Sequence, residues 1–148
     1  MNDITAELDD FLVRYAGALA SFDAEAAAAL WGAPGMILDD RSVGVVETRE
    51  AMVDGLKRSY PLYRRLGLTA VGHELLSRDQ LSDAVFLVRV RWLFYDGDGD
   101  LMTDSFGSYL LRRDADGAGL RAFVYVPVDD AEKLRELAVR KGIDLTGE

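Results

Sequence analysis

The sequence has 148 residues and a formal net charge of −9, with 17 lysines and arginines against 26 aspartates and glutamates. This length is typical of a single domain, and the absence of cysteine excludes disulfides, thiolate nucleophiles and zinc–thiolate sites. The negative charge disfavours binding to nucleic acid or to an anionic membrane surface. The acidic start "MNDITAELDD" is unlike a secretory signal, and no apolar run approaches the ~20 residues that span a bilayer. We therefore expect a cytoplasmic protein.

The first third of the chain has the pattern of helices. Apolar side chains recur at steps of three and four residues and predict one amphipathic helix over residues 4–22. Asp23 is placed to cap a short second helix, "AEAAAALW". Gly32 and Pro34 are expected to stop that helix, because neither residue favours a helix interior.

Two short extended segments follow, around residues 36–39 and 43–46. Thr48 then has the position of an N-cap for a third helix. Pro61 should bend or end this helix, because proline lacks the backbone N–H that a helix interior requires.

The chain after residue 67 has the composition of strands. Four segments are rich in β-branched and aromatic residues, namely "LTAVGHELLSR", "DAVFLVRVRWLFY", "LMTDSFGSYLLRR" and "LRAFVYVP". The breaks between them are too short for a crossover helix, so we expect an antiparallel meander. The acidic break "DGDGD" is interpreted as a hairpin turn and not as a calcium loop, because the glycine and glutamate positions of an EF-hand are not matched.

The longest predicted strand indicates which face of the sheet is covered. One side of it is entirely apolar and should meet the helices, with members Phe86, Val88, Val90, Trp92 and Phe94. The other side is mixed and includes Arg89 and Arg91, which is typical of a half-solvated face or a dimer interface.

A last helix completes the α+β arrangement. Asp129 with Glu132 three residues later forms a capping box, and the helix should end near Lys141 and Gly142. We assign residues 1–128 to one domain and residues 129–148 to a helical extension of the same domain. That extension could cover the pocket as a lid or decorate an edge of the sheet.

Several stretches resemble the NTF2-like superfamily, in particular its SnoaL-like and ketosteroid isomerase-like branch. They are "RYAGALASFDAEAAAALWGAPGMILDD", "TREAM" and "SYLLRRDADGAGLRAFVY", and the resemblance spans residues 4 to 126. It implies a cone in which three N-terminal helices pack on a curved antiparallel sheet, here with an added C-terminal helix. It also implies a deep apolar pocket that binds a small molecule, and a homodimer formed through the outer face of the sheet.

The resemblance also implies two catalytic residues. In the ketosteroid isomerase branch a helix-one tyrosine donates to the substrate oxygen and an aspartate moves the proton, and these positions fall on Tyr15 and Asp39. Asp40 takes the role if the register slips by one residue. The alternatives without a catalytic role are that Asp39 is a solvated acid at the end of a strand and that Tyr15 is a core residue. The second acid of steroid isomerases has no convincing counterpart, since Asp104 lies close to a strand start.

Five aromatic residues are candidates for the pocket wall, although aromatic residues at these spacings also serve as plain core packing. They are Trp31, Tyr60, Trp92, Phe94 and Tyr109. His73 is the single histidine and lies in a predicted strand, so we expect it to be structural, with assistance in proton transfer as the alternative if it faces inward. We expect no metal or organic cofactor.

The sequence thus predicts a SnoaL-like pocket protein. It would isomerise, cyclise or dehydrate a small apolar carbonyl compound by cofactor-free proton transfer. The alternative is an NTF2-like module that binds a ligand or dimerises without catalysis.

Overall fold

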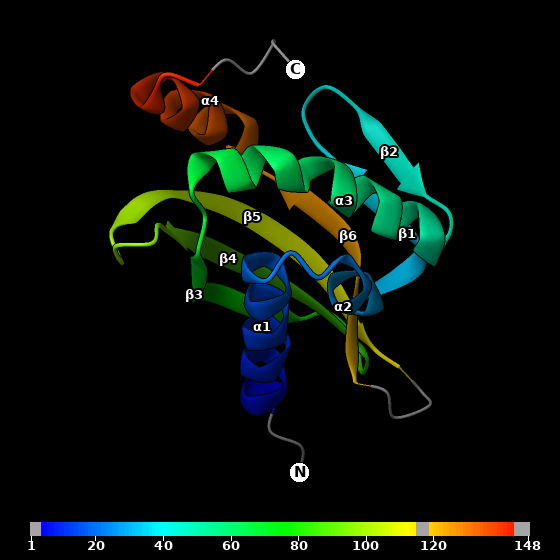
Figure 1. Cartoon of the computed structure of the whole chain (residues 1–148). Helices are drawn as coiled ribbons and strands as arrows, with labels where there is room; N and C mark the ends of the chain where they lie inside the picture. Colours follow the sequence, from blue (N-terminus) through cyan, green and yellow to red (C-terminus); the bar gives the residue numbers. More distant parts are fainter. Residues whose placement is uncertain (1–3, 115–118, 144–148) are drawn as a thin grey trace.

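The computed structural model describes residues 4–114 and 119–143 (Figure 1). The helices are α1 (Ile4–Ala20), α2 (Ala24–Ala29), α3 (Arg49–Leu66) and α4 (Asp130–Lys141). The strands are β1 (Trp31–Leu38), β2 (Val43–Val46), β3 (Ala70–Gln80), β4 (Val85–Tyr95), β5 (Leu101–Arg113) and β6 (Leu120–Pro127). The predicted α+β class is confirmed, with the helices packed on one curved sheet (Figure 1).

The six strands form one sheet in the order β2-β1-β6-β5-β4-β3. Strands β3 to β6 are the expected antiparallel meander. The sequence did not reveal that β1 pairs in parallel with β6 and joins the amino-terminal third of the chain to the meander. Strand β1 already begins at Trp31, so Gly32 and Pro34 lie within this strand beyond the end of α2.

The helix starts follow the side-chain chemistry of the caps. The Asp23 carboxylate accepts the Ala26 N–H at 3.0 Å, and the Thr48 hydroxyl accepts the Ala51 N–H at 3.0 Å, as predicted. Helix α3 continues through Pro61 to Leu66, so the expectation that proline would end it is wrong. Within the described residues, no helix combines the length and apolarity needed to cross a membrane.

The main core lies between the sheet and helices α1 to α3. The predicted inner face of β4 is confirmed, because Phe86, Val88, Val90 and Trp92 are all buried against this core. Helices α1 and α3 cross over the same face of the sheet (Figure 1). The loop after β4 is the expected turn, in which Asp96 accepts backbone N–H groups at 2.9 and 3.0 Å.

Helix α4 covers the part of β5 that β6 does not reach. Strand β6 pairs with β5 only from Gly107 onward. Before that point the backbone of Phe106 donates to the Asp129 carboxylate at 2.8 Å and accepts from Val128 N–H at 3.0 Å. Asp129 is the N-cap residue of α4, but its side chain makes this contact to β5 and not the predicted capping box. Helix α4 therefore closes an open strand edge, which is one way that proteins protect such edges.

Candidate functional site

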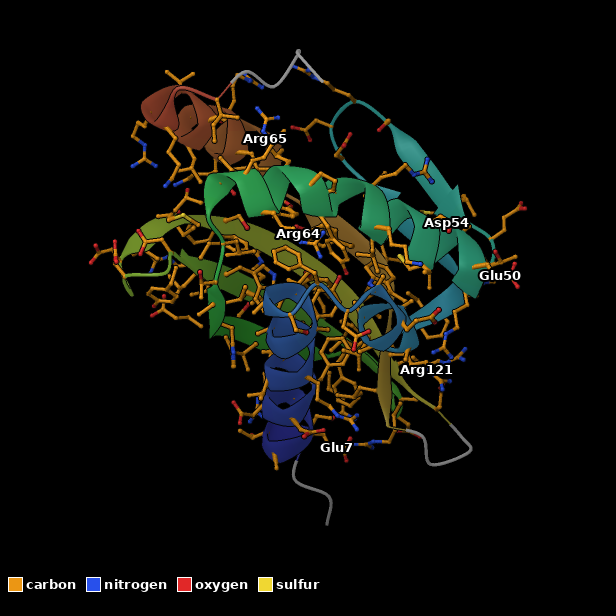
Figure 2. The ribbon with its side chains drawn as sticks, in the orientation of Figure 1. Glu7, Glu50, Asp54, Arg64, Arg65 and Arg121 are labelled. Carbon is orange, nitrogen blue, oxygen red and sulfur yellow. The ribbon has the colours of Figure 1, made fainter. Side chains whose placement is uncertain are left out.

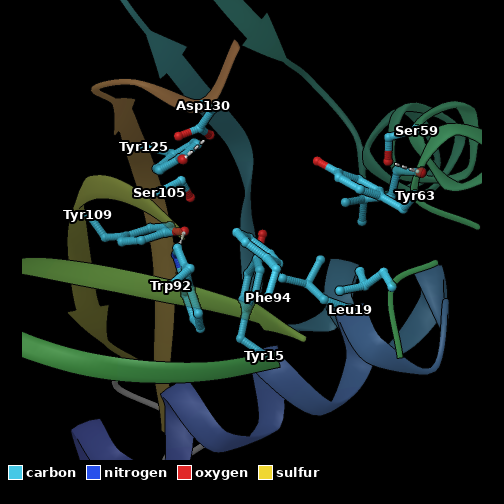
Figure 3. Close-up of a pocket in the computed structure, with 12 residues that line it drawn as sticks. Tyr15, Leu19, Ser59, Tyr63, Trp92, Phe94, Ser105, Tyr109, Tyr125 and Asp130 are labelled. Atoms are coloured by element: carbon cyan, nitrogen blue, oxygen red, sulfur yellow. Dashed lines mark hydrogen bonds between the residues drawn. The ribbon is translucent and has the colours of Figure 1, made fainter. Parts of the chain in front are cut away.

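A cavity of about 140 Å³ lies between the helices and the inner face of the sheet (Figure 3). Its walls come from α1, α3, β4, β5, β6 and α4. The lining residues are Tyr15, Leu19, Leu56, Ser59, Tyr63, Leu68, Trp92, Phe94, Ser105, Tyr109, Tyr125 and Asp130. Six of these twelve side chains are aromatic and only one carries a formal charge, so the cavity is an aromatic chamber with a single acid.

Small residues on β5 create the space for this chamber. Ser105 and Gly107 lie on the same face of β5 as Tyr109. The ring of Tyr125 lies over Gly107, where an added Cβ atom would be 2.4 Å from the ring. Tyr125 also stacks on Tyr109, with ring centroids 4.6 Å apart. The glycine thus allows a tyrosine from β6 to lie across β5 and reach the cavity.

Asp130 is the acid of the cavity and is the first residue of α4. The Tyr125 hydroxyl donates a hydrogen bond to Asp130 Oδ2. Asp130 Oδ1 is buried and has no hydrogen-bond partner among the described residues. Burial raises the pKa of Asp130, and the Tyr125 hydrogen bond opposes that shift only in part. A carboxyl group in this setting can accept a proton and release it again.

Tyr15 faces the cavity from α1, and its hydroxyl oxygen accepts the indole N–H of Trp31 at 3.0 Å. An indole N–H can only donate, so this contact leaves the phenol proton of Tyr15 free to point elsewhere. Burial raises the pKa of Tyr15 to about 12, which keeps the phenol protonated at neutral pH. Tyr15 therefore has the properties of a hydrogen-bond donor to a ligand oxygen.

A second tyrosine–tryptophan pair forms the adjoining wall. The Trp92 indole N–H donates to the Tyr109 hydroxyl at 3.0 Å. Burial raises the pKa of Tyr109 well above its ordinary value. The rings of Tyr15 and Trp92 lie 5.6 Å apart, and those of Tyr15 and Tyr109 lie 6.2 Å apart. These contacts hold the aromatic wall in one arrangement.

The structure does not bring Asp39 to the cavity, so its expected position in the pocket is wrong. Asp39 Oδ1 accepts the backbone N–H groups of Arg41 at 2.9 Å and Ser42 at 2.8 Å, in the exposed turn between β1 and β2. These hydrogen bonds, that of Arg41 foremost, lower the pKa of Asp39, which is opposite to the shift expected for a base in an apolar pocket. Asp39 therefore shapes a turn. The fallback residue Asp40 is exposed as well.

The predicted wall residues divide into two groups. Trp92, Phe94 and Tyr109 line the cavity together with Tyr15. Trp31 is buried behind this lining, where it orients Tyr15, and Tyr60 packs edge-on against Phe22 with centroids 5.2 Å apart. His73 lies on β3 with Nε2 3.4 Å from an Asp9 carboxylate oxygen, and it is not part of the lining.

Sequence reasoning missed Tyr125 and Asp130. Regular alternation along β6 would place Tyr125 on the side opposite Ala122, which is an inner-face residue with 0% exposure. A bulge intervenes, because Leu110 and Leu111 of β5 pair with Val124 and Ala122 respectively. The extra residue turns Tyr125 inward. For Asp130 the available signal was the pair Asp129–Asp130. Only one of these acids can occupy the cap position, so the other needs a different role.

Charged side chains on α3 lie outside the chamber. Figure 2 shows Glu50, Asp54 and Arg65 projecting from the solvent side of this helix, and all three are exposed. Arg64 is also exposed and lies over the ring of Phe22, 4.4 Å from its centroid. None of these charged side chains lines the chamber, whose polar groups include the Asp130 carboxyl and the tyrosine hydroxyls.

The raised pKa of Asp130 gives a testable pH dependence of stability. Because the folded-state pKa lies above the ordinary value of 3.8, the carboxyl group favours folding fully below pH 3.8, and this contribution is lost as the pH rises through the folded pKa. Asparagine does not ionise, so the stability of Asp130→Asn should not fall with pH for this reason. The free energy of unfolding of this variant, relative to the parent, should rise with pH across that window in urea titrations.

Asp104→Asn provides a control of opposite sign. The Lys133 ammonium foremost, 2.7 Å away, and Arg91 lower the pKa of Asp104. Its carboxylate therefore contributes stability above pH 3.8 that is lost as the pH falls through the folded pKa. The relative stability of Asp104→Asn should fall as the pH rises. If the difference in free energy of unfolding between Asp130→Asn and the parent did not change with pH, the assignment of Asp130 as an acid with a raised pKa would be contradicted.

Comparison with known proteins agrees with this architecture. The family model described as NTF2-like protein (DUF6841) matches residues 2–129. No match was found among curated protein sequences. Among solved structures, Aln2 from a Streptomyces species is similar with a TM-score of 0.67 and 17% identity, over 92% of this chain and 97% of that chain.

Two further solved structures have names that bear on chemistry. A ketosteroid isomerase-like protein from Erwinia carotovora atroseptica has a TM-score of 0.60 and 17% identity, over 86% of this chain and 96% of that chain. A protein from Catenulispora acidiphila in complex with S-DNPA has a TM-score of 0.61 and 19% identity, over 87% of this chain and 96% of that chain. At these identities the likeness establishes the shared fold alone.

Proposed function

Since the chain belongs to the NTF2-like family DUF6841, we propose that it binds a small apolar carbonyl compound in the aromatic chamber and catalyses proton transfer on it. The single observation that carries this proposal is the half-buried Asp130 of the chamber lining, whose carboxyl group has one unpartnered oxygen among the described residues and a raised pKa. Buried acids with raised pKa values in apolar cavities are typical of proton-transfer sites. The S-DNPA complex of a relative supports a ligand-binding role for this fold.

The proposed reaction requires no group beyond the protein's own side chains. The ionised Asp130 carboxylate removes a proton from a carbon adjacent to the carbonyl, so that a C–H bond breaks and an O–H bond forms on the carboxyl group. The electron pair moves onto the carbonyl oxygen, which becomes an enolate and is stabilised by the Tyr15 hydroxyl. Asp130 then returns the proton to the same or to a conjugated carbon, which gives exchange or isomerisation. Tyr15 keeps the oxygen-side role that the resemblance implied, and Asp130 takes the role that was expected of Asp39.

Deuterium exchange tests this proposal without knowledge of the natural substrate. Cyclic ketones incubated with the protein in D₂O should exchange their α-hydrogens faster than in buffer, as followed by proton NMR. The alternative function, ligand binding without catalysis, predicts line broadening or chemical-shift changes of the same ketones with no gain in exchange. Neither binding nor exchange by any ketone would contradict both functions.

We also propose that the protein forms a homodimer through the outer face of the sheet. Half-buried apolar side chains on this face, Leu87, Leu93, Leu110 and Val124, surround the exposed Arg89. Arg89→Glu should weaken the dimer, because it places the same negative charge on both subunits among these apolar side chains. Sedimentation velocity should show a shift towards monomer, whereas Arg58→Glu on the exposed side of α3 should leave the distribution unchanged. A parent protein that sediments as a monomer would contradict the dimer.

A further inference from the structure

We propose that the ligand of the aromatic chamber is an uncharged compound built on a single six-membered ring that carries a carbonyl group. This inference rests on the proposed function and narrows it to one substrate class, cyclic enones of one ring. Three independent features of the chamber lead to it: its volume, the charges of its walls, and the positions of its polar atoms.

The volume limits the ligand to one ring. The chamber measures about 140 Å³, and a protein cavity of about 150 Å³ accommodates a benzene molecule. A second fused ring would have to displace part of the wall, either on the helix side that includes Leu56 or on the aromatic side formed by Tyr15, Trp92 and Tyr109. These three rings contact one another at centroid distances of 5.6 to 6.3 Å, and each is less than 8% exposed. Displacing such residues would disrupt close packing.

The walls offer no cationic side chain to pair with a negatively charged ligand. None of the lining residues is arginine, lysine or histidine. Lys133, on the same helix as Asp130, is already paired with Asp104 at 2.7 Å. A carboxylate or phosphate in the chamber would therefore be buried without a counter-charge and close to Asp130, which is strongly unfavourable.

A positively charged ligand is disfavoured by the surroundings of Asp130. One of its oxygens already accepts a hydrogen bond from the Tyr125 hydroxyl, and burial raises the pKa of the carboxyl group. Aromatic walls can bind cations through their faces. A cation held by Asp130 would, however, occupy the carboxylate that the proposed proton transfer needs as its base. The chamber is thus best matched by a neutral ligand.

The polar atoms specify a carbonyl group and an acidic hydrogen. Tyr15 offers a phenol proton, because its oxygen is engaged by Trp31. Asp130 offers a carboxyl acceptor on the sheet and α4 side of the chamber, across from Tyr63 of α3 (Figure 3). A ring that places its carbonyl oxygen at Tyr15 and an adjacent C–H at Asp130 satisfies both groups while its carbon atoms contact the aromatic walls.

Four probes test this ligand class by isothermal titration calorimetry. They are 2-cyclohexen-1-one, its two-ring counterpart 1-decalone, the anion benzoate and the cation cyclohexylammonium. We expect 2-cyclohexen-1-one to bind and the other three to bind at least about tenfold more weakly. Equal or tighter binding of decalone would overturn the size limit, and equal or tighter binding of either ion would overturn the neutral class.

The same probes separate failure of this inference from failure of the proposed function. If decalone binds and exchanges its α-hydrogens in an Asp130-dependent manner, the result supports proton transfer and contradicts the one-ring limit. If 2-cyclohexen-1-one and decalone neither bind nor exchange, both proposals fall.

A variant that enlarges the chamber should gain binding of a larger ligand. A misfolded protein would lose binding, so misfolding cannot explain such a gain. Leu56 lines the chamber from α3, and Leu56→Ala should open space beside the ring. We expect decalone to bind this variant at least about tenfold more tightly than it binds the parent. Leu76→Ala on β3 removes the same atoms from a residue that is 51% exposed and outside the lining, and it should leave decalone binding unchanged. No gain in Leu56→Ala, or an equal gain in both variants, would overturn the inference.

Discussion

Asp130→Asn is expected to slow the exchange of ketone α-hydrogens by about 100-fold or more, the range in which a positioned acid–base group contributes. The amide has nearly the shape of the carboxyl group but cannot take up a proton from carbon. The variant should still bind a ketone, because asparagine can accept the Tyr125 hydroxyl hydrogen bond and the aromatic walls are unchanged. Proton NMR in D₂O measures exchange, and calorimetry measures binding.

Asp39→Asn is the matched control for this experiment. It changes the same side chain by the same atoms, at the acid that was expected in the pocket and that the structure places in an exposed turn. We expect exchange within about twofold of the parent, since an asparagine oxygen can also accept turn N–H groups. Loss of exchange in Asp39→Asn with normal exchange in Asp130→Asn would reverse the assignment.

Tyr125→Phe tests the role of the hydrogen bond that one of the two Asp130 oxygens accepts. Removing the phenol hydroxyl takes away the hydrogen bond to Oδ2 and leaves the ring over Gly107 in place. The Tyr125 hydrogen bond lowers the pKa of Asp130, so its loss should raise that pKa further. The pH at which exchange reaches half its maximum should therefore move upward, whereas a role confined to packing would leave the pH profile unchanged.

The sequence predicted the fold well because local chemistry determines most of it. Cap residues such as Asp23 and Thr48 and the alternation along β4 each specify structure within a few neighbouring residues. The parallel pairing of β1 with β6 was missed because it joins segments that are about 90 residues apart in the chain. No local pattern in either strand identifies its partner.

The candidate site was predicted only in part for a related reason. Tyr15, Trp92 and Tyr109 lie on elements whose periodicity is regular, so their inward direction follows from the sequence. Tyr125 faces inward because of a bulge, and Asp130 reaches the chamber because Asp129 is engaged by the backbone of β5. Both features depend on tertiary contacts that sequence alternation does not encode.

Gly107→Ala is expected to destabilise the protein by about 2–4 kcal/mol, from overpacking and from the loss of one buried hydrogen bond. The new Cβ atom would lie 2.4 Å from Tyr125 Cε1 and 3.1 Å from its hydroxyl oxygen, so the ring must leave its position. That movement breaks both the stacking on Tyr109 and the hydrogen bond to Asp130. Urea denaturation should show the lower stability, and exchange of ketone α-hydrogens should fall with it.

Gly72→Ala and a double-mutant cycle isolate the cause of this effect. Gly72 lies within β3, where the nearest atom to an added Cβ is Tyr95 Cε2 at 3.4 Å, so this alanine should change stability by less than about 1 kcal/mol. In a Tyr125→Leu background the ring is absent, and Gly107→Ala should cost at least about 1 kcal/mol less than in the parent. If the cost were the same in both backgrounds, the glycine would matter for the backbone of β5 alone. In that case the space it leaves for Tyr125 would not be the feature that builds the chamber.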